Sequence, residues 1–269
     1  MKILLISLLL IALTAGFVHA QSTASKQIST FNIASPDLGI KKKIWVYTPK
    51  SYKNSNKSYP VIYMFDAQNL FDAKTSYAGE WEIDEYLDSL TTKDKEAIIV
   101  GIEHGNDKRI DELTPYSHEK HGGGNGDLFL QFIIKNVKPE IDKTYRTKSS
   151  AKFTTIFGSS LGGLMALYAV IKYPETFTKA GVFSPAFWIN PEINDFIKTS
   201  EILKSTKFYF MAGSAESDTM IADMKKVITL LKVKGIKDKQ IKSTVIEGGE
   251  HNEKLWRDNF PDAFQWLMN

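Results

Sequence analysis

Apolar runs with the character of buried strands alternate with stretches of helical periodicity along most of this sequence. The runs at 59–65 and 97–102 are almost continuously apolar, as expected of parallel strands that are buried on both faces. Between them, residues 80–90 carry apolar side chains at the spacing of a helix. Strands separated by helices predict an α/β fold with a mostly parallel central sheet and helices on both faces.

The same alternation continues to the end of the chain. We expect further strands at 153–157, 179–183, 207–211 and 241–246, and further helices at 127–141, 161–171, 219–233 and over the last residues. The first two predicted strands, 27–34 and 44–47, are joined by a short connection, which favours antiparallel pairing at one edge of the sheet. The polar stretch 50–58 predicts a hairpin turn, and 103–125 a long irregular loop.

Composition excludes several classes of protein. The 269 residues include no cysteine, which removes disulfide scaffolds, thiolate nucleophiles and cysteine-ligated metals. The 34 basic and 31 acidic residues nearly balance, and no basic stripe interleaves with aromatic residues, so we expect no nucleic-acid partner. The two histidines of His118-Glu119-Lys120-His121 lack the spacing of paired metal ligands. We therefore predict no metal and no cofactor, and the sequence leaves the oligomeric state open.

The first twenty residues have the pattern of a secretory signal. Lys2 provides a positive charge, residues 3–17 are apolar, and Val18-His19-Ala20 places small residues at the positions that signal peptidases require. We expect cleavage before Gln21 and export of the mature chain, either to a periplasm or to the medium, with no membrane anchor afterwards. No linker, repeat or low-complexity run divides the remainder, so residues 21–269 are predicted to form one domain.

A candidate nucleophile lies at one predicted strand-to-helix junction. Gly158-Ser159-Ser160-Leu161-Gly162 fits the pattern Gly-x-Ser-x-Gly, between the strand at 153–157 and the helix at 161–171. A sharp turn in this position strains the central serine and raises its hydroxyl above the sheet. The alternative is that Ser160 only caps the helix.

A serine hydroxyl needs a base, and His251 is the only histidine that follows Ser160 in the sequence. It comes directly after the last predicted strand. An acid to orient it should follow the strand at 207–211, where Glu216 and Asp218 compete. We favour Glu216 because it is nearer the strand end, whereas Asp218 is suited to capping the next helix.

Two backbone amides are candidate donors to an oxyanion. The first is Leu161, directly after the candidate nucleophile, at the positive end of a helix. The second lies after the strand at 59–65, where we favour Gln68 with Ala67 as the adjacent alternative. Ordinary turn chemistry also explains the polar residues of this loop.

Several segments together resemble the putative esterase family of the α/β-hydrolase fold. The resemblance covers roughly residues 40–268 and is carried by Met64–Asp72, Glu112–Pro115, Ile141-Asp142-x-x-Tyr145-Arg146-Thr147, Gly158–Gly163 and Ser184-Pro185-x-x-Trp188. The family includes enterochelin-esterase-like proteins, feruloyl and acetylxylan esterases, S-formylglutathione hydrolases and mycolyltransferases. The resemblance implies a small-molecule or glycan ester as substrate, Ser160 as nucleophile, His251 as base and Glu216 where relatives often have aspartate. Position 67 is alanine where many relatives have glycine.

The expected activity is hydrolysis of a carboxylic ester by an exported enzyme. Acyl transfer by the same residues and a non-catalytic binding protein on the same fold remain alternatives. Tyr116 and Trp188 are candidate walls of a substrate pocket. Arg109 is expected to form an ion pair with Asp111 or Glu112 rather than to hold an anionic substrate. Whether the ester is a siderophore, a feruloyl or acetyl polysaccharide or a short-chain compound stays open.

Overall fold

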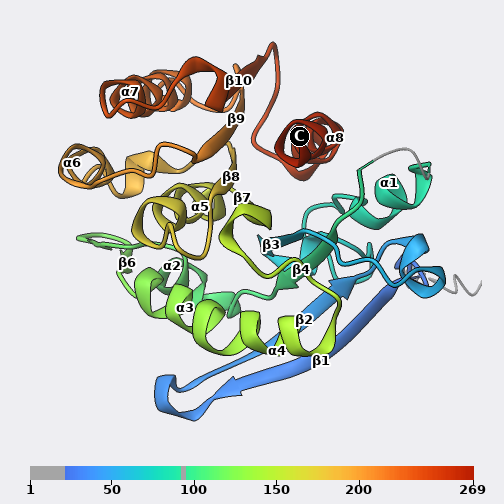
Figure 1. The fold of residues 1–269 in the computed structure, drawn as a ribbon. Coiled ribbons are helices and arrows are strands. Elements are labelled where there is room, and N and C mark those ends of the chain that lie inside the picture. The colour runs from blue at the N-terminus through green and yellow to red at the C-terminus, as the bar shows by residue number, and fades with distance from the viewer. Residues whose placement is uncertain (1–21, 92–94) are drawn as a thin grey trace, which may run out of the picture.

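In the computed structural model, which describes residues 22–91 and 95–269, a mixed sheet of eight strands forms the centre of the described chain (Figure 1). The predicted signal segment, residues 1–20, lies outside the described residues. The strands of this sheet are β1 (Ile28–Ser35), β2 (Ile40–Tyr47), β3 (Val61–Phe65), β4 (Ile98–Ile102), β7 (Thr154–Ser159), β8 (Lys179–Phe183), β9 (Lys207–Gly213) and β10 (Ile241–Ile246). Two short strands, β5 (Ser117–His118) and β6 (Gly122–Gly123), pair separately.

The spatial order of the large sheet is β1-β2-β4-β3-β7-β8-β9-β10. β1 pairs antiparallel with β2, and β2 antiparallel with β4, while the remaining neighbours are parallel. The predicted mostly parallel sheet with antiparallel strands at its N-terminal edge is confirmed. The hairpin predicted at 50–58 is wrong, because β2 and β3 flank β4 and do not pair with each other.

Helices cover both faces of the sheet, as predicted. They are α1 (Ile83–Ser89), α2 (Arg109–Glu112), α3 (Gly126–Phe132), α4 (Lys138–Thr144), α5 (Leu161–Lys172), α6 (Ile193–Thr199), α7 (Met220–Val233) and α8 (Glu253–Met268). A π-helical segment, Ile133–Val137, joins α3 to α4. The stretch 103–125 is not wholly irregular, since it contains α2 and the β5–β6 pair. Among the described residues, no helix has both the length and the apolar character needed to cross a membrane.

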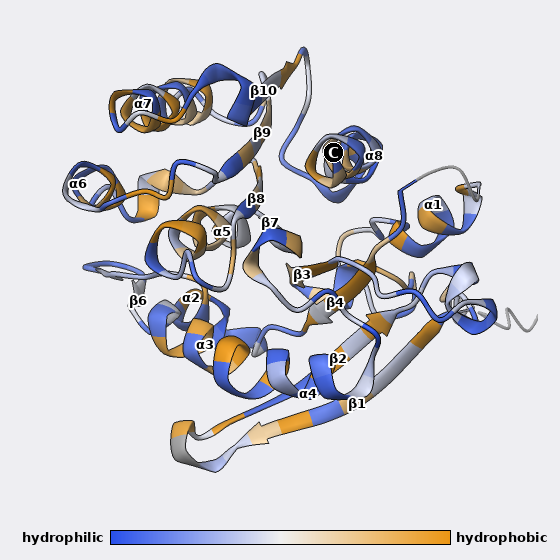
Figure 2. Ribbon diagram, viewed as in Figure 1, coloured by the Kyte–Doolittle hydropathy of each residue, from blue (hydrophilic) through white to orange (hydrophobic). Residues whose placement is uncertain are grey.

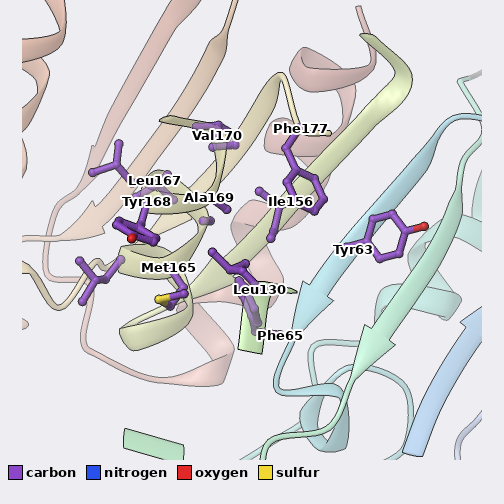
Figure 3. Close-up of a cluster of buried hydrophobic side chains, with 14 of the residues drawn as sticks. Tyr63, Phe65, Leu130, Ile156, Met165, Leu167, Tyr168, Ala169, Val170 and Phe177 are labelled. Carbon is purple, nitrogen blue, oxygen red and sulfur yellow. The ribbon is translucent and has the colours of Figure 1, made fainter. Parts of the chain in front are cut away.

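The two faces of the sheet build two hydrophobic clusters. Val61, Tyr63 and Phe65 of β3 join a cluster with α3, α5, α6 and α7, part of which is shown in Figure 3. Ile62 and Met64 face the other way, toward α1 and α8. Figure 1 shows these helices on opposite sides of the sheet, and in Figure 2 β3 and β4 are mostly hydrophobic. Burial of apolar surface on both faces therefore fixes the strand ends that carry the candidate site.

The segment before β1 packs on a group of acidic residues around α1. Thr23 donates to Glu80 at 2.8 Å, and the Ser25 amide donates to Asp84 at 2.7 Å. Burial raises the pKa of Asp84 to about 8, and the neighbouring Glu85 adds to the shift. Burial likewise raises the pKa of Glu80 to about 7. The fold therefore holds protons here that an unfolded chain releases near pH 4.

Replacing Asp84 should change how stability depends on pH. The folded pKa of Asp84 lies above the unfolded value, so stability falls as pH rises from about 4 toward 8. Asp84→Asn cannot lose a proton, and we expect its free energy of unfolding to match that of the wild type near pH 4 and to exceed it by a margin that grows by about 1.4 kcal/mol per pH unit up to pH 8. Urea unfolding at both pH values measures this, with Glu201→Gln as an exposed control. If the free energy of unfolding changed by the same amount between the two pH values in wild type and in Asp84→Asn, the prediction would be contradicted.

Candidate active site

The junction between β7 and α5 forms the sharp turn that the sequence predicts. Ser160 has φ 56° and ψ −120°, a backbone conformation that residues other than glycine rarely adopt. A Cβ on Gly158 would lie 2.7 Å from the Gly162 backbone, so the turn closes only because position 158 carries no side chain. The Ser160 amide donates to the Phe183 carbonyl at 2.9 Å, which ties the turn to β8.

The acid and the base predicted from the sequence lie in contact. Nδ1 of His251 lies 2.6 Å from Oε2 of Glu216, whose carboxylate side chain is fully buried. The other oxygen of Glu216 accepts from the Gly213 amide at 2.5 Å and from the Ser184 hydroxyl at 2.7 Å. Asp218 is exposed, forms no hydrogen bond or ion pair with any described residue, and does not cap α7. The arrangement brings Glu216, not Asp218, to His251.

The loops that carry the acid and the base meet through bare backbone. A Cβ on Gly213, at the end of β9, would lie 2.1 Å from the carbonyl oxygen of Gly249. The Ala215 amide also donates to that carbonyl at 2.9 Å. Glycine at both positions therefore allows the loops after β9 and β10 to approach closely enough for the contact between Glu216 and His251.

Sequence reasoning missed the residues behind the acid. Ser184 is fully buried with φ 43°, and its hydroxyl accepts from the Trp256 indole N–H at 2.8 Å while donating to Glu216. The Trp256 ring also packs edge-on against His251, with ring centroids 5.1 Å apart. The Ser184-Pro185 motif was visible in the sequence, but no spacing rule connects it to a tryptophan 72 residues later.

We expect Ser184 to be a positioning residue for Glu216. Ser184→Ala removes a hydrogen bond to a buried carboxylate, so kcat/KM for an ester should fall by about 10- to 100-fold. Trp256→Phe keeps a ring against His251 but loses the N–H, and a smaller loss is expected. Trp266→Phe, also on α8, is the matched control. Steady-state kinetics with melting curves tests this, and wild-type kcat/KM in Ser184→Ala would contradict the role.

Ser160 and His251 line one cavity of about 590 Å³. Its walls include aromatic residues from two parts of the chain, namely Tyr77 and Trp81 before α1 and Trp256 on α8. A cavity of this size accommodates a typical small-molecule ligand. Tyr116 and Trp188 do not line it: Tyr116 packs on Tyr168, and Trp188 contacts His118 and His121.

The candidate oxyanion donors lie in the first turns of two helical segments that follow the neighbouring parallel strands β7 and β3. Leu161 is the first residue of α5, and Ala67 and Gln68 open the 3-10 helix Ala67–Asn69 that follows β3. Amides in a first helical turn have no partner within the helix, which leaves them free to donate to a ligand. The Gln68 side chain donates to the His104 carbonyl at 3.0 Å and accepts from the His104 amide at 3.3 Å. Gln68 thus joins this loop to the loop after β4.

Charged residues beside the cavity form a fixed pair. Arg109 donates to both oxygens of Asp66 at 2.8 Å. The ion pair expected with Asp111 or Glu112 is therefore wrong: Asp66, brought near by the fold, takes the guanidinium, and Glu112 pairs with Lys42. Burial opposes the charge of Arg109, but the carboxylate of Asp66 raises the pKa of Arg109 overall.

His104 lines the cavity and has no role in the sequence prediction. Burial lowers the pKa of His104, which favours the neutral ring. Its Nδ1 accepts from the Asn106 amide at 2.9 Å, so the neutral ring carries its proton on Nε2. Burial also raises the pKa of Glu253, another wall residue.

The fold and the position of this site define an α/β-hydrolase. A strained serine at a strand-to-helix turn faces a cavity with a histidine that an acid contacts, and all of these residues follow the carboxyl ends of parallel strands. Residues 35–267 match the family model described as Putative esterase. The chain belongs to that family and is an esterase-family hydrolase.

Three comparisons illustrate the relationship. The chain is 28% identical to the uncharacterized protein YbbA of Bacillus subtilis, over 84% of this chain and 92% of that protein. It is 32% identical to the ferri-bacillibactin esterase BesA of the same organism, over 55% of each chain. The enterobactin esterase FES from Shigella flexneri, solved in the presence of enterobactin, superposes with a TM-score of 0.72 and 20% identity, over 91% of this chain and 60% of FES.

Proposed function

We propose that this protein is an exported serine esterase that hydrolyses a carboxylic ester through an acyl-enzyme. The observation that carries the proposal is the 2.6 Å contact between His251 and Glu216 in the cavity that Ser160 also lines. A base with a fixed partner and a serine on a strained turn are the parts that activate an alcohol for attack.

In the proposed reaction, the Ser160 hydroxyl attacks the ester carbonyl while His251 takes its proton. Glu216 engages Nδ1, which leaves Nε2 to accept the proton and later return it to the leaving alcohol. The amides of Leu161 and of Gln68 or Ala67 would hold the developing oxyanion. Water then attacks the acyl-enzyme with His251 again as base, which releases the acid and regenerates the serine.

The substrate class rests on the cavity and on the named relatives. Exposed Tyr77 offers an aromatic face on which a ring of a substrate can stack, while Trp81 and Trp256 reach the cavity wall with only 4% and 6% of their surface exposed. BesA and FES are named as esterases of ferri-bacillibactin and enterobactin, and two other relatives are named siderophore esterases. We therefore propose an ester that carries aromatic groups, and siderophore esters are the first compounds to test.

Labelling with a fluorophosphonate tests the mechanism, because this probe reacts with activated serines. We expect one modified residue, Ser160, identified by mass spectrometry of the digested protein. A panel of p-nitrophenyl acetate, methyl ferulate and enterobactin, the compound for which FES is named, then ranks substrates by kcat/KM. An unlabelled protein, or a label on another residue, would reject the serine mechanism.

The proposal includes cleavage before Gln21 and export. The sequence pattern of residues 1–20 supports it. Cell fractionation should find the protein outside the cytoplasm, and its N-terminal sequence should begin at Gln21. A protein that retains Met1 would contradict export by this route.

A further inference from the structure

A second cavity lies at the opposite end of the parallel strands from the candidate active site. Its volume is about 590 Å³, and its wall includes the residues that precede or begin β3, β7, β8 and β9. Ser160, Glu216 and His251 all follow the carboxyl ends of strands. The two cavities are therefore separate, and the esterase reaction makes no use of this one.

The wall of the second cavity is strongly cationic. Six lysines line it: Lys57, Lys95, Lys148, Lys152, Lys179 and Lys207. The one side-chain carboxylate in the wall is Glu96. The whole sequence, by contrast, has 34 basic and 31 acidic residues. Positive charge is thus concentrated here well beyond the average of the chain.

Most of these lysines have no counter-charge. Lys57 pairs with Glu96, and Lys179 donates to the Leu267 carbonyl at 2.6 Å. Within the described part of the chain, the other four ammonium groups have no carboxylate partner. Two of them, on Lys148 and Lys152, instead lie 5.0 and 5.6 Å from the centre of the Phe153 ring.

The pKa of Lys179 is affected by the other lysines of this cavity. It is the first residue of β8, and its side chain is largely enclosed. Burial lowers the pKa of Lys179 to about 8, and the charges of Lys207, Lys152 and Lys95 add to the shift. Like charges gathered in a concave wall raise the local potential, and a bound anion would relieve both the repulsion and the cost of burying the ammonium group.

We propose that this cavity binds a small anion that carries several negative charges, of phosphate or carboxylate type. The volume suits a ligand of small-molecule size, and four unpaired ammonium groups match several anionic groups on one ligand. Phe153, between two lysines, offers a ring surface beside them.

Titration calorimetry of the full-length mature protein with inorganic pyrophosphate tests the site, and citrate provides the carboxylate arm. We expect wild type to bind at least one of the two with a Kd below about 1 mM. Lys152→Gln/Lys207→Gln should weaken that binding by at least about tenfold. Lys225→Gln/Lys226→Gln, two exposed lysines on α7, removes the same net charge elsewhere and should weaken it less than about twofold.

Each outcome decides the proposal. Equal losses in the two double variants, or no binding of either anion by wild type, would overturn it. Should Lys152→Gln/Lys207→Gln fail to fold, Lys95→Gln/Lys148→Gln changes two more exposed lysines of the same wall. Ser160→Ala should bind the anion like wild type, so the result stands whether or not the serine mechanism is correct.

Discussion

Ser160→Ala should reduce kcat/KM for p-nitrophenyl acetate by about 10⁶-fold and leave the fold intact. Alanine has no hydroxyl to attack the ester, so an acyl-enzyme on residue 160 cannot form. The strained backbone at this position is not relieved or worsened by alanine, which tolerates φ 56° no better than serine does. Burst kinetics and a thermal melting curve measure both parts of the expectation.

An exposed serine provides the control for this variant. Ser149→Ala makes the same chemical change on the surface and should keep wild-type activity. If Ser160→Ala retained more than a trace of turnover with a native melting temperature, the cavity would hydrolyse esters by another route, and water activated by His251 would become the hypothesis to examine.

Glu216→Gln should reduce kcat/KM by about 10⁴-fold, the second largest effect. The amide keeps the shape of the side chain but removes the charge that stabilises the protonated imidazole. Its oxygen can still accept from Gly213 and Ser184, but its NH₂ group then faces Nδ1 of His251 and favours the wrong tautomer of the ring. The pH profile of kcat/KM should change as well, because the base loses its ionic partner.

Asp218→Asn is the matched control, since it removes the same charge two residues away. Asp218 is exposed and has no partner among the described residues, so activity should stay within about twofold of wild type. A larger loss in Asp218→Asn than in Glu216→Gln would reverse the assignment of the acid.

The sequence predicts where the strands lie better than it predicts which strands pair with each other in the sheet. β3 and β4 are recognisable because each is a short apolar run, yet nothing local shows that β2 skips β3 to pair with β4. That pairing depends on the burial of both strand faces, which is a property of the whole sheet. The seven-residue helix α6 was missed because it is too short for a clear helical period.

Some residues of the candidate site could also be predicted from the sequence, and others could not. Ser160, His251 and Glu216 could be proposed because each follows a strand in a known chain order. Ser184, Trp256 and the pair of Asp66 with Arg109 could not, because their contacts join residues 72 and 43 positions apart with no repeating pattern. Tyr116 and Trp188 show the converse: aromatic residues near a predicted pocket in sequence need not lie in its wall.

The position of His251 after β10, the last strand, has a consequence during synthesis. Ser160 is translated well before His251. A chain that is paused or truncated ahead of β10 therefore contains the serine but not the histidine. Such a nascent chain would not hydrolyse esters in the cell that synthesises it. Activity, if Ser160 and His251 act together, would appear only after β10 and the loop that carries His251 have been translated and folded onto the sheet.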